Sequence, residues 1–261
     1  MSGALEIAAV GLRAHQRALE TIAGNIANVN TPSYKRADIK FAELVGGLAV
    51  SGAHPNQKAA EVPAFLVVNG IRAWSTAEID RQGMLDVTGN ALDLAIDGAG
   101  FVELMGPAGR SLLWRGGTLR ILDDGSLATE AGFPLRAGIL APRDAVALRI
   151  ERDGTVFAQY AGERGDDEIG RIALVRAGDD SSLTRLDGGV YESIQGADLV
   201  EMSPGEDGLG YIVQGSLERS NVELNEEMVE LLIAQRAYAA SAQVVRAADE
   251  FLSLANNLRR S

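Results

Sequence analysis

The sequence has no cysteine and only two histidines, and both shortages exclude classes of chemistry. Without cysteine the chain forms no disulfide, carries no catalytic thiolate and offers no thiolate ligand to a metal ion. His15 and His54 stand apart from any metal-ligand spacing such as H-E-x-x-H, so we interpret both as structural or solvated residues. We therefore expect no metal site.

Long apolar runs are absent as well. A helix that spans a bilayer needs about 20 consecutive apolar residues, and no stretch of this chain approaches that length. Glu6 and Arg13 interrupt the apolar residues near the N-terminus, and no A-x-A cleavage site follows them, so no secretory signal is predicted. Taken alone, these features predict a cytoplasmic protein with no membrane span.

Positive charge is scarce relative to negative charge. The 261 residues include 24 Lys and Arg against 36 Asp and Glu, which gives a formal net charge of -12. A surface of that sign does not attract nucleic acid or acidic lipid, so we expect neither as a partner. The hydrophobic fraction of 46% is ordinary for globular proteins and suffices for one large or two smaller domains.

A catalytic constellation is also missing. There is no G-x-S-x-G elbow for a nucleophilic serine. Gly98-Ala99-Gly100 lacks the third glycine or the Gly-Lys-Ser/Thr that a phosphate-binding loop requires. The acidic clusters at 123–124 and 166–168 do not continue as calcium-binding loops, and we interpret them as hairpin tips or solvated loops. We expect no enzymatic activity and no cofactor.

The first 30 residues have the pattern of a helix that packs on another helix. Apolar residues recur every seven positions, and a row of small residues runs beside them. Pro32 disfavours helix at Thr31 and marks the end of the pattern. The apolar row is Leu5, Leu12, Leu19 and Ile26, and the small row is Ala4, Gly11, Ala18 and Asn25.

Residues 220–260 repeat this pattern over a greater length. Ser220-Asn221-Val222-Glu223 has the form of a capping box, with Ser220 as the N-cap residue and Glu223 reaching back. A helix of this size is roughly 55 Å long, and such long patterns without Gly or Pro are typical of coiled coils. Its apolar row is Leu217, Leu224, Leu231, Tyr238, Val245 and Leu252, and its small row is Ala234, Ser241, Ala248 and Ala255.

The middle of the chain has a different sequence pattern. Short apolar stretches alternate with glycine-containing turns, and Asp123-Asp124-Gly125 and Asp153-Gly154 are hairpin signals between strand-like runs. Residues 46–70 are polar and are predicted to be a connector. The predicted fold class is therefore α+β, with long N- and C-terminal helices that pair as a coiled coil and a central antiparallel β-domain at 71–214.

The two ends of the chain resemble one family of proteins. The stretch NIANVNTPSYKR, residues 25–36, resembles the Asn-rich motif of flagellar rod and hook proteins, although Ser33 stands where that motif usually has glycine. Residues 217–259 resemble the C-terminal motif of the same family. Segments 92–104, 117–135 and 148–158 are similar to the β-domain of the rod proteins that carry one. The resemblance covers most of the chain, and the paired terminal motifs are highly specific.

This resemblance implies a self-assembling structural subunit of the bacterial flagellar basal-body rod, polymerising into a tubular drive shaft for motility. In the family the terminal segments, here 1–45 and 215–261, form an inner coiled-coil layer, and the β-domain forms an outer layer. Members leave the cell through the flagellum-specific type III apparatus without a cleaved signal, which implies a periplasmic location in the basal body. The chain length fits either the distal rod protein or the β-domain-bearing proximal rod protein.

The resemblance also implies partners and an assembly interface. The expected partners are further copies of the chain, other flagellar rod and hook proteins, and the export apparatus, with ring proteins or peptidoglycan as further candidates. Lys35 and Arg36 are expected to meet acidic residues such as Glu226 or Glu227 of another subunit. The expected interface residues are Asn25, Asn28, Asn30, Tyr34, Lys35, Ser220, Asn221, Glu227, Met228, Gln235, Arg236 and Tyr238.

Two other functions stay open on the residues alone. The end helices could form a hairpin within a monomer, with a β-domain that binds a ligand, which would make the chain a non-flagellar binding module. A wall-degrading hydrolase is the third alternative, but no pair of carboxylates with a defined catalytic spacing supports it.

Overall fold

The chain divides into two compact units, each built from segments that are far apart in sequence. The computed structural model describes residues 2–43, 71–162, 165–177, 183–186, 188–193 and 199–258. The predicted connector at 46–70 lies outside the described residues. The helical unit consists of Met1–Ala27, Ala37–Thr76 and Glu223–Ser261, and the β unit consists of Asn28–Arg36 and Ala77–Val222.

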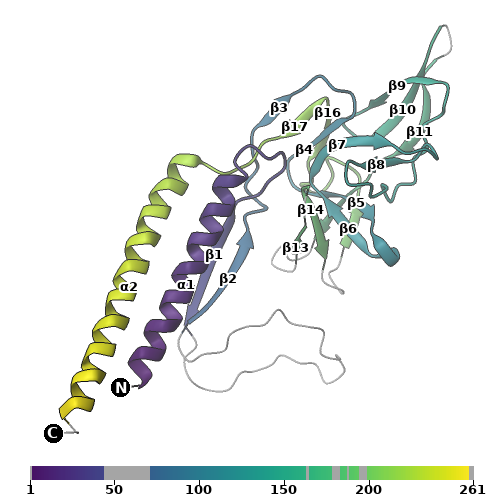
Figure 1. Ribbon diagram of the computed structural model, residues 1–261. Coiled ribbons are helices and arrows are strands. Elements are labelled where there is room, and N and C mark those ends of the chain that lie inside the picture. Colours follow the sequence, from purple (N-terminus) through teal and green to yellow (C-terminus); the bar gives the residue numbers. More distant parts are fainter. Residues whose placement is uncertain are drawn as a thin grey trace. The chain divides into compact units, whose positions relative to one another are not determined.

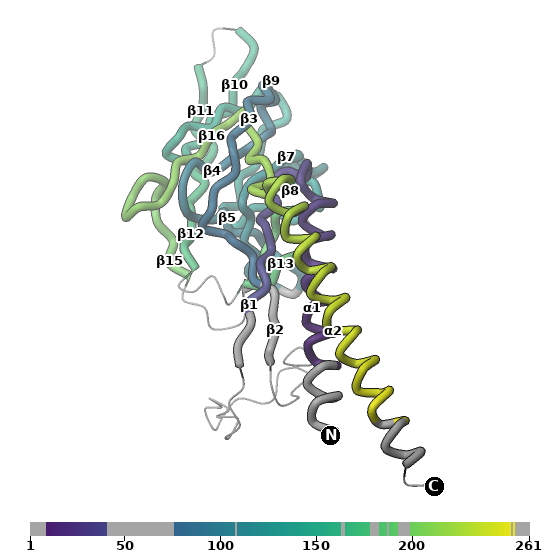
Figure 2. Tube along the Cα trace, turned by 90° about the vertical axis from the view of Figure 1, so that its left-hand side faces the viewer, coloured from purple at the N-terminus to yellow at the C-terminus, as the bar shows by residue number. Residues whose placement is uncertain are grey.

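Two long helices form the body of the helical unit. Helix α1 spans Ser2–Ala27 and helix α2 spans Leu224–Leu258. They lie side by side and run in opposite directions, so both chain ends lie at the same end of the pair (Figures 1 and 2). Strands β1 (Ala37–Glu43) and β2 (Ile71–Ala77) pair as a two-stranded sheet. No helix in the described part of the chain is long and apolar enough to cross a membrane.

The contact between α1 and α2 uses the periodic residues of both helices. On α2, Ala234 is buried, and the heptad residues Leu231, Tyr238 and Val245 are half-buried. On α1, Gly11 of the small row lies near α2, because a side-chain carbon added to it would lie 4.0 Å from the hydroxyl of Ser241. Small residues allow the two backbones to approach, and the larger residues flank the contact. The prediction of two terminal helices that contact each other is confirmed.

The predicted start of the second helix is wrong. Helix α2 begins at Leu224, and the N–H of Glu227 donates to the carbonyl of Glu223 at 3.1 Å. The hydroxyl of Ser220 accepts a hydrogen bond from the N–H of Val222 at 3.3 Å instead of capping the helix. The capping box fails because Asn221, inside it, is held in an extended segment by hydrogen bonds to the β unit, described below.

Four antiparallel sheets make up the β unit (Figure 1). The largest has the order β13-β14-β6-β5-β12-β15, and a four-stranded sheet has the order β16-β4-β7-β8. The strands of the six-stranded sheet are β5 (Phe101–Met105), β6 (Ser111–Trp114), β12 (Leu174–Ala177), β13 (Leu183–Arg185), β14 (Val190–Ser193) and β15 (Leu199–Met202). Those of the four-stranded sheet are β4 (Asp93–Asp97), β7 (Gly116–Ile121), β8 (Leu127–Thr129) and β16 (Tyr211–Gln214).

Two smaller sheets complete the unit. A three-stranded sheet has the order β11-β10-β9, and a two-stranded sheet pairs β17 with β3. A 3-10 turn, η1, spans Pro107–Gly109. The strands are β3 (Leu85–Val87), β9 (Ala145–Ile150), β10 (Thr155–Tyr160), β11 (Asp167–Arg171) and β17 (Ser216–Glu218).

Both predicted hairpins are present. Strand β7 pairs with β8 across Asp123-Asp124-Gly125, and β9 pairs with β10 across Asp153-Gly154. Each glycine has a positive φ, 87° and 86°, which side-chain-bearing residues rarely adopt. Hydrogen bonds from Ser126 lower the pKa of the Asp124 carboxyl, and hydrogen bonds from Thr155 lower that of Asp153. The two acidic residues therefore close turns, as the sequence predicted.

The β unit has two buried apolar clusters. The larger joins residues of three of the four sheets, the six-, four- and three-stranded ones, and includes Leu94, Leu104 and Trp114. The smaller contains Phe101 and Tyr191, whose rings meet edge to face with centroids 5.6 Å apart. The Tyr191 hydroxyl is buried without a hydrogen-bond partner among the described residues, and burial raises its pKa to about 12.

Replacing Tyr191 by Phe removes this unpartnered hydroxyl. We expect the free energy of unfolding at pH 8 to stay the same or rise by up to about 1 kcal/mol, because no hydrogen bond is lost. Folded Tyr191 titrates at about 12, whereas an unfolded tyrosine titrates near about 10, so its raised pKa removes stability from the natural chain as pH rises through that window. Tyr191→Phe should lack this component.

Urea unfolding of the full chain at pH 8 and pH 11, followed by tryptophan fluorescence, measures both effects. Tyr211→Phe, at an exposed position, is the matched control and should change neither. A loss of more than about 1 kcal/mol for Tyr191→Phe at pH 8 would mean that the hydroxyl has a partner after all.

Candidate functional site

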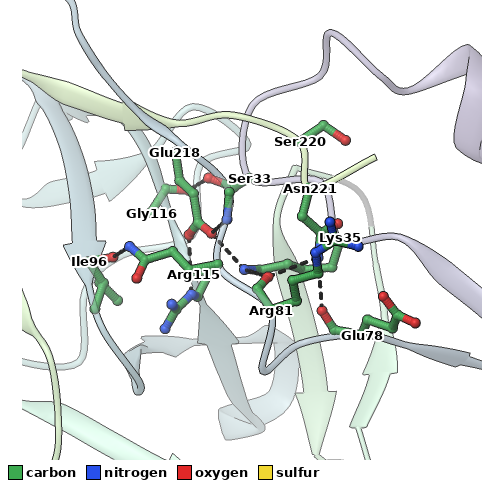
Figure 3. A network of polar contacts seen from close by, with 12 residues as sticks. Ser33, Lys35, Glu78, Arg81, Ile96, Arg115, Gly116, Glu218, Ser220 and Asn221 are labelled. Carbon is green, nitrogen blue, oxygen red and sulfur yellow. Dashed lines mark hydrogen bonds and ion pairs between the residues drawn. The ribbon is translucent and has the colours of Figure 1, made fainter. Parts of the chain in front are cut away.

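The Asn-rich segment 28–36 and the residues around β17 come together in the β unit. The N–H of Ser33 donates to the carbonyl of Glu218 at 2.7 Å, and the N–H of Asn221 donates to the carbonyl of Tyr34 at 3.3 Å. These backbone bonds join two segments that lie near opposite ends of the sequence. Figure 3 shows the polar side chains that surround this junction.

A buried ionic cluster, made of Lys35, Arg115 and Glu218, lies at the centre of the junction. The Glu218 carboxylate accepts from the Lys35 ammonium at 2.6 Å, from the Arg115 Nε at 3.3 Å and from the N–H of Gly83 at 2.8 Å (Figure 3). The side chains of Lys35 and Glu218 are fully buried, and that of Arg115 is 4% exposed. One carboxylate therefore serves two cations from different parts of the chain.

Backbone carbonyls satisfy further donors of the two cations. Lys35 also donates to the carbonyl of Arg81 at 2.9 Å. Arg115 donates to the carbonyl of Gly100 at 2.6 Å and to that of Gly98. Burial lowers the pKa of the Lys35 ammonium, the Glu218 carboxylate opposes that shift, and the neighbouring charge of Arg115 adds to it. The position of Lys35 is thus unfavourable for its charge except for the contact with Glu218.

The Asn221 side chain joins its own segment to two other segments of backbone, at Arg36 and at residues 78–81. Its amide oxygen accepts from the N–H of Arg36 at 2.6 Å, and its amide nitrogen donates to the carbonyls of Glu78 and Arg81 at 3.1 and 2.8 Å. The asparagine side chain supplies two N–H donors and a carbonyl acceptor on separate atoms, so it serves all three backbone groups at once. This explains why asparagine stands here and why residues 220–223 do not join helix α2.

The turn before Tyr34 depends on a serine in a left-handed conformation. Ser33 has φ of 56°, a region in which glycine is the usual residue. The Ser33 hydroxyl donates to the carbonyl of Gly116 at 3.1 Å, which offsets part of the backbone strain. The Tyr34 ring is buried beneath the guanidinium of Arg185, 3.6 Å from the ring centroid.

In the helical unit, Asn25 has a similar role. Its amide nitrogen donates to the carbonyl of Ala37 at 2.9 Å and to the carboxylate of Glu227 at 3.1 Å, and its amide oxygen accepts from the N–H of Ala37 at 2.9 Å. Asn25 and Glu227 are both fully buried. One amide thereby connects the end of α1, the start of β1 and the first turn of α2.

The remaining predicted interface residues lie nearer the surface. Met228, Gln235 and Arg236 are exposed on α2, and Tyr238 is half-buried on the side that faces α1. Ser220 is half-buried, as described. Asn28 is half-buried and accepts from the hydroxyl of Thr31 at 3.1 Å, whereas Asn30 is exposed.

The expected ionic partner of Lys35 needs correction. Lys35 pairs with Glu218 of the same chain, rather than with Glu226 or Glu227 of another subunit. Arg36 pairs with Glu78 at 3.3 Å, and its expected contact with another subunit stays a prediction. Burial removes the Lys35 ammonium from the reach of another subunit. The sequence interpretation also missed Glu218 and Arg115. The available signal was weak: a strand places Ser216 and Glu218 on one face, and that face is buried.

The arrangement of these side chains holds two segments of the chain in place. Among the described residues there is no group of three or more His, Cys, Asp or Glu side chains that could hold a metal ion. The charged groups of the ionic cluster are paired and buried, and they fix where the Asn-rich segment lies against β17.

Comparison with known families matches three separate segments of the chain. Three family models match it: flagella basal body rod protein over residues 5–35, flagellar hook protein FlgE/F/G D1 domain over 95–158, and flagellar basal body rod FlgEFG protein C-terminal over 213–258.

Several curated proteins are similar over nearly the whole chain. The flagellar basal-body rod protein FlgG of Caulobacter vibrioides is 32% identical over 98% of this chain and 99% of its own length. That of Agrobacterium fabrum is 34% identical over 96% of this chain and 97% of its own. The flagellar hook protein FlgE of Salmonella typhimurium is 32% identical over 45% of this chain and 29% of its own length.

Glu218→Gln should destabilise the chain more than Lys35→Met. The first change leaves two buried cations without their carboxylate, which costs about 3–5 kcal/mol. The second leaves Glu218 with Arg115 and the N–H of Gly83, and it removes an ammonium whose burial is unfavourable, so its cost should be smaller by about 1–2 kcal/mol. Urea unfolding of both variants measures the difference, and a larger loss for Lys35→Met would overturn this order.

Asn25→Asp should destabilise the helical unit in a pH-dependent way. The new carboxylate would lie beside that of Glu227, so the pKa of one of the two rises in the folded state. Stability is then lost as pH rises through that raised pKa, by roughly 3 kcal/mol at pH 7, and is partly regained near about pH 4–5.

Helical circular dichroism during urea unfolding at both pH values reports this change. The control is Asn30→Asp, which adds the same charge at an exposed asparagine of the same segment. It should alter stability by no more than about 0.5 kcal/mol. A pH-independent loss for Asn25→Asp would count against the contact with Glu227.

Proposed function

This chain belongs to the family of flagellar basal-body rod proteins and is a structural subunit of the rod, and we propose that its terminal helices assemble as coiled coils into the wall of a tubular drive shaft. The observation that carries the proposal is a second apolar stripe on α2. Its residues are exposed and lie on a different side of α2 from the heptad residues Leu231, Tyr238 and Val245, although Ile233 also borders a pocket lined by residues of α1 and β1.

The stripe consists of Val229, Ile233, Val244 and Phe251, each more than half exposed. They follow one another at intervals of four, eleven and seven residues. These intervals are sums of four and seven, so the four side chains lie on one side of the helix. Ala240 and Ala247 fall on the same side and keep the stripe free of large polar groups.

An apolar stripe of this length supports a helical partner. Covering each large side chain removes it from water and contributes about 1.5–3 kcal/mol. The α1 contact already occupies the heptad residues Leu231, Tyr238 and Val245 of α2. A helix with one stripe on its own chain and another on its outer side suits a layer in which each subunit binds the next. We take the partner of the stripe to be a helix of another copy.

The predicted interface residues then divide into three groups. Asn25, Tyr34, Lys35, Asn221 and Glu227 are buried, and we infer that they act within the subunit by fixing the ends of its helices. Met228, Gln235 and Arg236 are exposed on α2, and we infer that they contact other subunits directly. Asn28, Asn30, Ser220 and Tyr238 also belong to the proposed interface, and their contacts with other subunits stay predictions.

Location and further partners follow from the family and are also proposals. As a rod protein the chain belongs to the flagellar basal body. We infer export through the flagellum-specific type III apparatus and a periplasmic position after export, with residues 1–45 and 215–261 in the inner layer and 71–214 in the outer layer. Neighbouring rod and hook proteins are the expected axial partners, and ring proteins or peptidoglycan would face the outer layer.

A charge within the stripe should block assembly without unfolding the subunit. Val244→Asp places a carboxylate where a neighbouring helix would bury it, and we expect the concentration needed for polymerisation to rise at least tenfold, or about 1.4 kcal/mol. Gln243→Asp is the matched control, because it adds the same charge one position away at an exposed polar residue. Sedimentation of assembled protein and swimming of cells that express each variant are the measurements. Equal loss for both variants would show that net charge, and not the stripe, controls assembly.

A further inference from the structure

The β unit contains a cavity of about 540 Å³ that the proposed assembly does not use. Residues 79–82, the turn between β4 and β5, Arg115 after β6, and β12 line it. Its volume lies within the range of sites that bind small molecules, about 300–1,000 Å³. The side chains that decide its chemistry are Asp80, Phe101, Arg115 and Arg176.

Arg115 brings unused hydrogen-bond donors to this cavity. A guanidinium has five N–H groups. Three of those of Arg115 donate to Glu218, Gly100 and Gly98, which leaves two without a partner among the described residues. The side chain is 4% exposed, so these donors are reached from within the cavity and not from the outer surface. Buried donors of this kind are costly unless an acceptor reaches them.

The charges in and behind the cavity do not cancel. Arg115, Arg176 and Asp80 line it, and Lys35 and Glu218 lie behind Arg115 in the buried ionic cluster. Three of these groups are cations and two are anions, which leaves one positive charge in excess. A ligand with a single negative charge would balance the group, whereas a doubly charged ligand would overcompensate it.

One wall of the cavity is apolar. Ile79, Phe101 and Ala177 line it, and all three are buried members of the smaller hydrophobic cluster. Gly98 and Gly100 also line the cavity, and they contribute backbone there instead of side chains. A fitting ligand therefore has an apolar body for this wall and one charged end for the guanidinium groups.

We propose that this cavity binds a small carboxylic acid with an apolar body, its carboxylate held by Arg115 and Arg176. The carboxylate accepts from the two unused N–H groups of Arg115, a geometry in which guanidinium and carboxylate match well. Arg176, exposed on β12, holds the second side of the charged end. The same chemistry is offered by a free acid and by the C-terminus of a peptide.

The test uses the full chain and 3-methylbutanoate as the probe, with 3-methylbutanamide as its neutral counterpart. The Arg115 Nε–H resonance in a nitrogen-15 NMR spectrum reports binding at the site itself. We expect the acid to shift this resonance saturably and the amide to bind at least tenfold more weakly, as expected when a charge-assisted hydrogen bond is lost. Equal shifts from the acid and the amide overturn the proposal.

Three variants separate the site from general charge effects. Arg176→Gln should weaken binding about tenfold, and Asp80→Asn should strengthen it by removing a carboxylate from the lining. Arg120→Gln, which removes another exposed strand arginine outside the cavity, should leave binding unchanged. Equal effects of Arg176→Gln and Arg120→Gln would contradict a specific site.

A last comparison distinguishes the two sources of the carboxylate. N-acetyl-Ala-Leu with a free C-terminus is titrated beside 3-methylbutanoate, and its C-terminal amide is the control. Tighter binding of the free peptide than of the small acid assigns the cavity to a peptide C-terminus, and tighter binding of the small acid assigns it to a free metabolite. If neither the acid nor the peptide binds, the cavity proposal is overturned. The assembly proposal is unaffected by that result, because the helical stripe lies in the other unit.

Discussion

The contact between the Glu218 carboxylate and two buried cations is the constraint on which the rest of the β unit depends. Lys35 comes from the Asn-rich segment and Arg115 from the end of β6, and both charges would be unfavourable in this position without Glu218. A buried charge tolerates little displacement of its partner, so the three segments keep a fixed register. An apolar contact of the same size would allow the segments to slide.

Two asparagines extend this control to the places where the chain leaves one unit for the other. Asn25 lies two residues before the boundary at Ala27 and bonds to Ala37, just after the boundary at Arg36. Asn221 lies just before the boundary at Val222 and bonds to the N–H of Arg36. In each case one side-chain amide binds backbone N–H and carbonyl groups that would be left unpaired where the chain turns out of a regular element. The Asn-rich motif is therefore explained first by the backbone of its own subunit.

The separation of buried polar residues from an exposed apolar stripe fits a protein that polymerises. The buried polar residues allow little movement at the ends of the helices, and the proposed stripe of α2 stays apolar and accessible. Rigid subunits lose less conformational freedom when they assemble, which favours association. The acidic net charge, carried by a chain with an apolar stripe, also limits nonspecific aggregation before assembly.

The sequence by itself determined the two terminal helices, the two hairpins and the family, because these depend on local periodicity, turn residues and motifs that a linear chain displays. It placed the start of α2 at Ser220, too early, since Asn221 is bound by backbone groups that no local pattern reveals. It also assigned Lys35 to the wrong carboxylate. Only the tertiary structure decided that Lys35 meets Glu218, 183 positions away, and that Arg115 joins them, because the cost of burying a charge depends on which segments the fold brings together.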